Sequence, residues 1–111
     1  MIAKRAQVGT FEQLVLLSLL RLRQDAYGLR VRDEIAIHTD LRPSLGAVYT
    51  TLERLESKGL VSSREGEKTA VRGGRAKRYF QIEAPGIMAL KCTRDATSKM
   101  TKGLESILEA R

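Results

Sequence analysis

The chain has 111 residues, of which 42% are hydrophobic and 30% are charged. This length suits one small domain and excludes a large multidomain enzyme, while the spread of Leu, Ile and Val excludes a disordered tail. Lysines and arginines outnumber aspartates and glutamates by 20 to 13, which gives a net charge of +7. So basic a chain predicts an anionic partner, either nucleic acid or a membrane surface.

The chain has one cysteine and one histidine. One cysteine cannot form an internal disulfide, and the two residues together cannot supply the ligands of a structural zinc site. We therefore expect a cytoplasmic protein without a metal or another cofactor. No nucleophile and base at a plausible spacing, no phosphate-binding loop and no carboxylate pair is found, so the sequence predicts that the chain is not an enzyme.

Two helices are predicted at the start of the chain. The first begins at Thr10, whose hydroxyl can cap the first turn while Gln13 completes a capping box, and it runs to about Arg23. Its apolar residues spread beyond one stripe, which indicates a helix contacted on several sides. The second helix is predicted over about residues 27–38, and Tyr27-Gly28 is interpreted as a tight entry into it.

A third helix is predicted over residues 45–58. Pro43 disfavours a helix before it, and Ser44 is a good N-cap for a helix that starts at the next residue. The Lys58-Gly59 pair supplies a cationic last turn and a stop. The apolar residues fall at spacings of three, four and three, which places them on one face: Leu45, Val48, Leu52 and Leu55.

Two segments with strand character come next, over 60–64 and 77–82, separated by a polar stretch with three glycines. They predict a β-hairpin with a long tip. Pro85 then suits the first turn of a helix that continues to the C-terminus, over 85–111. This order of elements predicts a mainly α (α+β) fold: a winged helix-turn-helix domain over 1–84, followed by a dimerisation helix.

The long helix is expected to form a dimer because its apolar row is too long for the core of one small domain. The residues assigned to the dimer interface are Met88, Cys92, Ala96, Met100, Leu104, Ile107 and Leu108. We interpret Cys92 as a small packed residue within this row.

The basic excess is greatest at the hairpin. Residues 64–84 carry six basic and three acidic side chains, and the stretch 72–78 has four cations and no acid. A helix-turn-helix uses its second helix to enter the major groove of DNA, and a basic hairpin beside it can meet phosphates. The residues assigned to DNA binding are therefore Ser44, Gly46, Ala47, Tyr49, Thr50 and Arg54 of the recognition helix, and Arg72, Arg75, Lys77 and Arg78 of the wing, 64–78.

Some of these assignments leave alternatives open. Tyr49 can bond a phosphate or pack under the wing. Strand alternation would aim Arg78, with Phe80 and Ile82, toward the buried face of the hairpin, which favours the other three wing cations as DNA contacts.

Four stretches, residues 16–20, 25–28, 44–61 and 74–80, resemble the PadR family of bacterial transcriptional regulators. They occur in the family's order over about residues 11–82. The resemblance implies a dimeric winged-helix repressor, often self-regulating and in some members released from DNA by a small molecule. A symmetric dimer predicts a pseudo-palindromic operator, because both recognition helices must reach one face of the DNA. The chain departs from the family at Glu83, where Thr is usual, and it has no Trp, with which drug-sensing members stack their ligands.

Two functions of other classes compete with DNA binding. The basic C-terminal helix could lie on a membrane, but Asp95, Glu105 and Glu109 dilute its cationic face, so we expect no membrane partner. The chain could also be a winged-helix module that binds an acidic protein through its wing. The basic wing and the recognition helix together favour double-stranded DNA.

Overall fold

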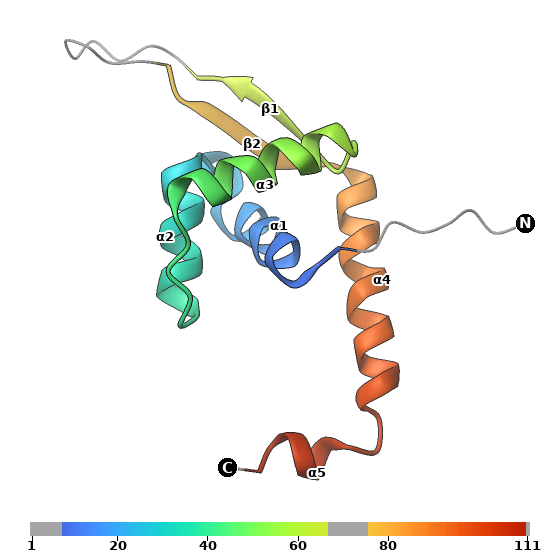
Figure 1. Ribbon diagram of the computed structural model, residues 1–111. Helices are drawn as coiled ribbons and strands as arrows, with labels where there is room; N and C mark the ends of the chain where they lie inside the picture. Colours follow the sequence, from blue (N-terminus) through green and yellow to red (C-terminus); the bar gives the residue numbers. More distant parts are fainter. Residues whose placement is uncertain (1–7, 67–75, 111) are drawn as a thin grey trace, which may run out of the picture.

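Figure 1 shows the computed structural model, which describes residues 8–66 and 76–110. Three helices and a short 3-10 turn come first, followed by a two-stranded hairpin and two further helices. Their bounds are α1 (Thr10–Leu22), η1 (Arg23–Asp25), α2 (Gly28–His38), α3 (Leu45–Ser57), β1 (Val61–Glu65), β2 (Arg78–Ile82), α4 (Ala84–Thr101) and α5 (Glu105–Leu108). The predicted mainly helical fold with a small antiparallel sheet is confirmed.

Helix α1 lies at the centre of the fold, where it contacts α2, α3, β2 and α4. Contact on several sides explains why its apolar residues extend beyond one stripe, as the sequence indicates. The largest completely buried side chains come from the three helices before the hairpin: Val15, Leu16, Val31, Val48, Leu52 and Leu55. Phe80 of β2 is 3% exposed and closes this core from the hairpin side.

The predicted cap of α1 is wrong by one residue. Gly9 is the N-cap, and its N–H donates a hydrogen bond of 3.1 Å to Oε1 of Glu12. Glu12 takes the role predicted for Gln13, because a glutamate at the third helical position reaches back to the amide of the N-cap. At the other end α1 stops at Leu22, and Arg23 has a positive φ of 56°.

Helix α3 begins as predicted, because the N–H of Ala47 donates to Oγ of Ser44 at 3.0 Å. It ends at Ser57, and Gly59 has a φ of 77°, which suits a glycine stop. The predicted burial of Leu45 is wrong, since this residue is 36% exposed. Leu45 is the first residue of α3 and lies at the N-terminal end of the helix. Thr51 lies closer to the middle of α3 and is buried instead.

The hairpin pairs β1 with β2 in antiparallel register, with Val61 opposite Ile82 and Glu65 opposite Arg78. Arg78 is exposed, so its predicted burial is wrong, although it bonds Ser63, the residue opposite Phe80, and so lies on the predicted side of the hairpin. Arg78 stands at the outer end of its strand, farthest from the core along the register, where its guanidinium donates to Oγ of Ser63 at 2.9 Å.

An isolated β-bridge joins the start of α2 to the second strand of the sheet. Tyr27 pairs with Tyr79, and the N–H of Phe80 donates to the carbonyl oxygen of Ala26 at 2.8 Å. This contact fixes the start of α2 against β2. The sequence does not predict it, because one residue leaves no strand pattern.

The predicted continuous helix to the C-terminus is wrong. Helix α4 ends at Thr101, Lys102 is extended, and Gly103 has a φ of 87°, after which α5 starts in a new direction. Gly103 allows this break, because a left-handed backbone costs glycine little. In α4 only Gly86, Ala89 and Leu90 are buried, so the rest of α4 and α5 form an arm that projects from the core (Figure 1).

The arm joins the core through a close contact at Gly86. A Cβ at this position would lie 2.4 Å from the carbonyl oxygen of Leu60 and 2.6 Å from Cγ1 of Ile82. Only glycine permits this approach of α4 to the base of the hairpin.

Glu12 provides a test of how α1 and α3 are joined. Nζ of Lys58, just after α3, donates to Oε2 of Glu12 at 3.0 Å. Partial burial raises the pKa of Glu12, but the hydrogen bonds from Lys58 and Gly9 outweigh it and lower this pKa from its ordinary value of 4.5. A carboxylate with a lowered pKa in the folded state stabilises the fold at higher pH, and this contribution is lost as the pH falls through the folded-state pKa.

We expect Glu12→Gln to lower the free energy of unfolding by about 1 kcal/mol at pH 7, measured by urea denaturation. The difference from the wild type should shrink below pH 4.5, the ordinary value of the carboxyl pKa. Glu109→Gln, which removes an exposed carboxylate from the arm, serves as the control and should unfold like the wild type. A difference for Glu12→Gln that stays constant from neutral to acidic pH would contradict this account.

Candidate nucleic-acid interface

Helix α3 has one buried face and one exposed face. Val48, Leu52 and Leu55 are completely buried. The residues assigned to DNA on this helix lie on the opposite side or its flank and are all exposed: Gly46, Ala47, Tyr49, Thr50 and Arg54. Gly46 and Ala47, near the start of α3, are small and would let DNA come close to the helix backbone. Thr50 and Arg54 share one surface of the helix because they are four residues apart.

The structure adds two details about the exposed face of α3, at Ser44 and at Glu53. The hydroxyl of Ser44 accepts the hydrogen bond of Ala47, so its observed role is to cap the helix. Glu53 is exposed beside Thr50 and Arg54, although the sequence does not assign it to the interface. A carboxylate repels phosphate but can accept a hydrogen bond from the amino group of cytosine.

Tyr49 packs against the start of α2. A Cβ placed on Gly28 would lie 2.4 Å from Cζ of Tyr49 and 2.7 Å from its hydroxyl oxygen. The tight entry predicted at Tyr27-Gly28 is therefore observed, and its reason is contact with the recognition helix. The observed neighbour of Tyr49 is thus α2, which neither alternative names, and the side chain stays 36% exposed.

Aromatic and cationic side chains stack at the base of the wing. The rings of Tyr27 and Tyr79 meet edge to face, with centroids 5.5 Å apart. Nζ of Lys77 lies 4.3 Å from the centroid of Tyr27, and the guanidinium carbon of Arg64 lies 4.8 Å from that of Tyr79. We call these four residues the wing-base stack. Cation–π contacts of this kind hold a long flexible side chain in one place.

The sequence does not predict the wing-base stack, since it indicates only a helix entry at Tyr27. Strand alternation does place Lys77 and Tyr79 on the same side of the second strand, which is a usable signal. The pairing of Tyr27 with Tyr79 is a contact between distant parts of the chain and has no local signature. Gly66 completes the site, because its N–H donates to the carbonyl oxygen of Lys77 at 2.6 Å.

The remaining wing cations divide into two groups. Arg78 is exposed and bonded to Ser63, so its side chain lies along the hairpin. Arg72 and Arg75 lie outside the described residues.

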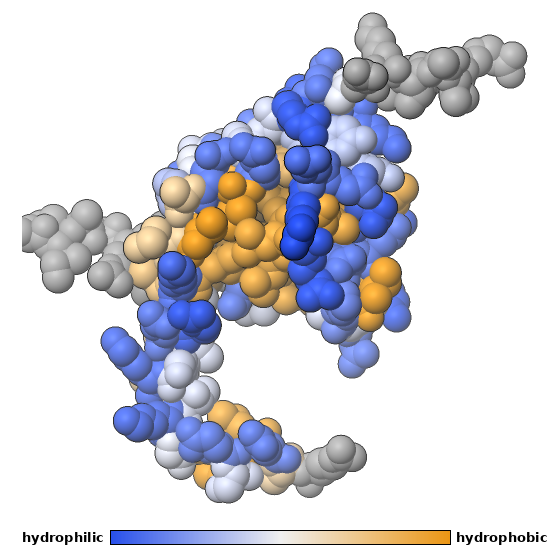
Figure 2. Space-filling view, turned by 180° about the vertical axis from the view of Figure 1, so that it is seen from behind, coloured by the Kyte–Doolittle hydropathy of each residue, from blue (hydrophilic) through white to orange (hydrophobic). Residues whose placement is uncertain are grey.

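The residues assigned to the dimer interface lie on the arm. Met88, Met100, Leu104, Ile107 and Leu108 are 44 to 79% exposed, Ala96 is exposed, and Cys92 is half-buried. The break at Gly103 separates the row into a part on α4 and a part on α5. Leu17 and Leu20 of α1 are also exposed, by 40% and 43%, and Figure 2 shows a broad apolar area on the body of the molecule beside the arm.

Over residues 8–66 and 76–110, no helix is both long and apolar enough to cross a membrane. Within the same ranges, no three His, Cys, Asp or Glu side chains come together as a metal site would require.

A central α1, a pair of helices α2 and α3 joined by a turn, and a two-stranded wing define a winged helix-turn-helix protein. The chain matches the model of the transcriptional regulator PadR-like family over residues 16–91, and it belongs to this family. It is therefore a transcriptional regulator, of a family whose members bind DNA. The resemblance seen in the sequence is confirmed.

Solved structures with the same fold include PadR-family regulators from three bacteria. The chain is similar to a regulator from Clostridium difficile R20291 with a TM-score of 0.70 and 20% identity, covering 88% of this chain and 98% of that one. For a PadR-like factor from Bacteroides fragilis the TM-score is 0.74 at 21% identity, with 89% and 90% covered. For one from Eggerthella lenta DSM 2243 it is 0.68 at 25% identity, with 89% and 84% covered. No curated protein matches the chain.

Proposed function

We propose that the chain is a homodimeric repressor that binds a pseudo-palindromic operator through α3 and the wing. The observation that carries this proposal is the division of α3 into a completely buried apolar face and an exposed face of small and polar side chains. Small residues at Gly46 and Ala47 let the helix enter the major groove deeply. Thr50 and Arg54 can then reach base edges or phosphates.

The wing adds contacts that do not depend on sequence. Lys77 is held over Tyr27 at the start of α2, and Tyr49 of α3 packs on Gly28 beside it. The same short segment therefore sets the positions of the recognition helix and of a wing cation. We assign Arg72 and Arg75 to the phosphate-binding residues as well, because they belong to the cationic stretch 72–78 of the sequence.

Selection of binding sites from random duplexes, followed by footprinting, tests the proposal. We expect enrichment of a pseudo-palindrome whose half-sites lie about 10 to 10.5 base pairs or a multiple of this apart, because two recognition helices must reach one face of the DNA. A promoter carrying the selected site should be less active when the chain is present. The absence of any enriched site would favour the alternative function, a module that binds acidic proteins.

Single substitutions on α3 distinguish side chains that recognise bases from side chains that contact only the DNA backbone. We expect Thr50→Ala and Arg54→Ala each to weaken binding to the selected site by about 1 to 3 kcal/mol and to leave binding to random DNA almost unchanged. Both side chains are exposed, so thermal stability should stay close to that of the wild type. Equal losses on both kinds of DNA would show that α3 only positions the protein.

Salt dependence tests the wing. If the wing neutralises phosphates, the logarithm of the affinity falls linearly with the logarithm of the salt concentration. Lys77→Ala should reduce this slope by about one unit for each phosphate that the lysine neutralises in the wild type. Lys99→Ala removes an exposed lysine from α4 and should leave the slope unchanged. An unchanged slope for Lys77→Ala as well would remove this lysine from the phosphate-binding residues.

The arm is the proposed dimer interface. Met100 and Ile107 are 79% and 69% exposed, and a row of exposed apolar side chains marks a surface for contact with another protein chain. We expect the wild type to sediment as a dimer at micromolar concentration, and Met100→Glu or Ile107→Glu to weaken dimerisation at least about tenfold. Arg94→Glu, on the opposite side of α4 from the apolar row, should remain dimeric. A monomeric wild type at this concentration would contradict the proposal.

A further inference from the structure

Glu53 lies on the most outward part of α3. Four residues of this helix are buried: Val48, Thr51, Leu52 and Leu55. Successive residues of an α-helix are turned by about 100°, so Thr50 and Glu53 lie about 60° apart, one on each side of the direction opposite to the buried residues. Arg54 lies farther round the helix, on the flank that it shares with Lys58, the partner of Glu12 on α1. Any surface that α3 enters therefore meets the Glu53 carboxylate directly.

The Glu53 carboxylate has no partner among the described residues. Its side chain is exposed, and it forms neither a hydrogen bond nor an ion pair within them. Glu56, the other acidic residue of α3, instead accepts a hydrogen bond from Ser63 of β1 at 2.8 Å. The positions where a helix places the partner of an ion pair, three and four residues from Glu53, hold no cation: Tyr49, Thr50, Glu56 and Ser57. The carboxylate oxygens of Glu53 are thus left for a partner outside the described chain.

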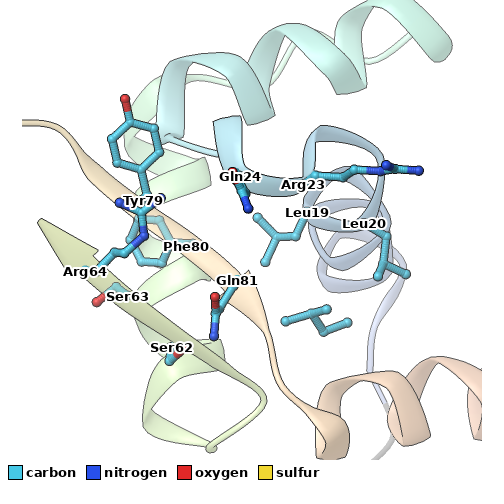
Figure 3. Close-up of a pocket in the computed structure, with 11 residues that line it drawn as sticks. Leu19, Leu20, Arg23, Gln24, Ser62, Ser63, Arg64, Tyr79, Phe80 and Gln81 are labelled. Atoms are coloured by element: carbon cyan, nitrogen blue, oxygen red, sulfur yellow. The ribbon is translucent and has the colours of Figure 1, made fainter. Parts of the chain in front are cut away.

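Glu53 does not face the cleft beside the hairpin. This cleft, of about 620 Å³, lies between the end of α1, the turn η1 and the two strands, and no residue of α3 lines it (Figure 3). A molecule held in the cleft would therefore not touch the Glu53 carboxylate. The partner of Glu53 must approach α3 from outside, and in the proposed function that partner is the major groove of DNA.

A carboxylate on this face restricts which DNA surface the helix can meet. Phosphates repel it, and so do the acceptor atoms that guanine and thymine present in the major groove. The amino group at N4 of cytosine instead donates a hydrogen bond, and it is the group with which glutamate and aspartate pair on a base edge. Adenine presents its amino group beside the acceptor N7, a pattern that suits an amide better than a carboxylate.

We propose that Glu53 accepts a hydrogen bond from the N4 amino group of a cytosine in each half-site of the operator, and so selects that base. The inference deepens the proposed function and rests on it. At a site without this cytosine, the carboxylate is left unpaired among phosphates and acceptor atoms, which weakens binding. Glu53 thus adds specificity by rejecting other sequences, whereas the proposed contacts of Thr50 and Arg54 add attraction.

Selection of binding sites with the wild type, Glu53→Gln and Glu56→Gln tests which base Glu53 contacts. We expect each half-site selected by the wild type to contain a cytosine that Glu53→Gln replaces by adenine, because an amide pairs with N6 and N7 of adenine. The other positions of the half-site should keep their preferences. Glu56→Gln makes the same change three residues farther along α3 and should select the wild-type sequence. Selection of the wild-type sequence by Glu53→Gln as well would overturn the proposal.

Removal of the amino group from the DNA tests the hydrogen bond itself. The operator is synthesised with pyrimidin-2-one, a cytosine analogue without the 4-amino group, at the cytosine that selection identifies. We expect this change to weaken binding by the wild type at least about fivefold and binding by Glu53→Ala less than about twofold, because the variant has no contact to lose. The weaker base pair of the analogue affects both proteins alike. Equal losses for the two proteins would overturn the contact.

Binding to random duplexes distinguishes base selection from general repulsion. We expect Glu53→Ala to bind the selected operator at least about fivefold more weakly than the wild type, and to bind random DNA more tightly. Its melting temperature should match that of the wild type, because the exposed side chain has no partner in the described fold. Tighter binding to both kinds of DNA would mean general repulsion and would overturn the proposal. A wild type that selects no site would overturn the proposed function together with this inference, whereas a clear operator that Glu53→Gln shares would overturn the inference alone.

Discussion

Helix α3 contacts α1 and α2, and its Val48, Leu52 and Leu55 belong to the same buried cluster as Val15 and Leu16 of α1. Rotation of α3 about its axis by one residue would move these three side chains out of the core, so the packing fixes which side of the helix faces outward. The exposed face of Gly46, Thr50 and Arg54 is a consequence of this packing. The Glu12 and Lys58 ion pair joins the same two helices at their ends and limits sliding of one along the other.

Most of the fold could be predicted from local patterns in the sequence. Apolar spacing identified the helices, and Ser44 and Gly59 marked the start and stop of α3 because caps depend only on neighbouring residues. The two wrong predictions of burial have a common cause, which is that the residue lies at the end of its helix or strand. Leu45 and Arg78 continue the buried pattern of their elements but stand at element ends, where the core no longer covers them. Gly103 interrupted a periodic row that, by spacing alone, continues to Leu108.

The candidate interface could be predicted only in part. The outward face of α3 follows from its apolar pattern, and the cationic character of the hairpin follows from composition. The partners of these groups could not be predicted, because they come from distant segments. Tyr27 lies 50 residues before Lys77 in the numbering, and only the folded chain brings the ring beneath the ammonium group. The three tyrosines of the chain all contribute to this region, Tyr49 through its packing on Gly28.

Glu83 stands where the hairpin meets α4, and all of its polar groups are engaged with one or the other. Its carboxylate accepts hydrogen bonds from Ser62 of β1 and from Gln81 of β2, which lower its pKa. Its N–H donates to Leu60 at 2.9 Å, while its carbonyl oxygen accepts from Gly86 and Ile87 of α4. With Gly86 pressed against Leu60 on the same joint, α4 behaves as a lever rigidly fixed to the hairpin. In the proposed dimer, a tilt of the arm between two subunits would therefore change the angle at which each wing meets its half of a shared DNA duplex.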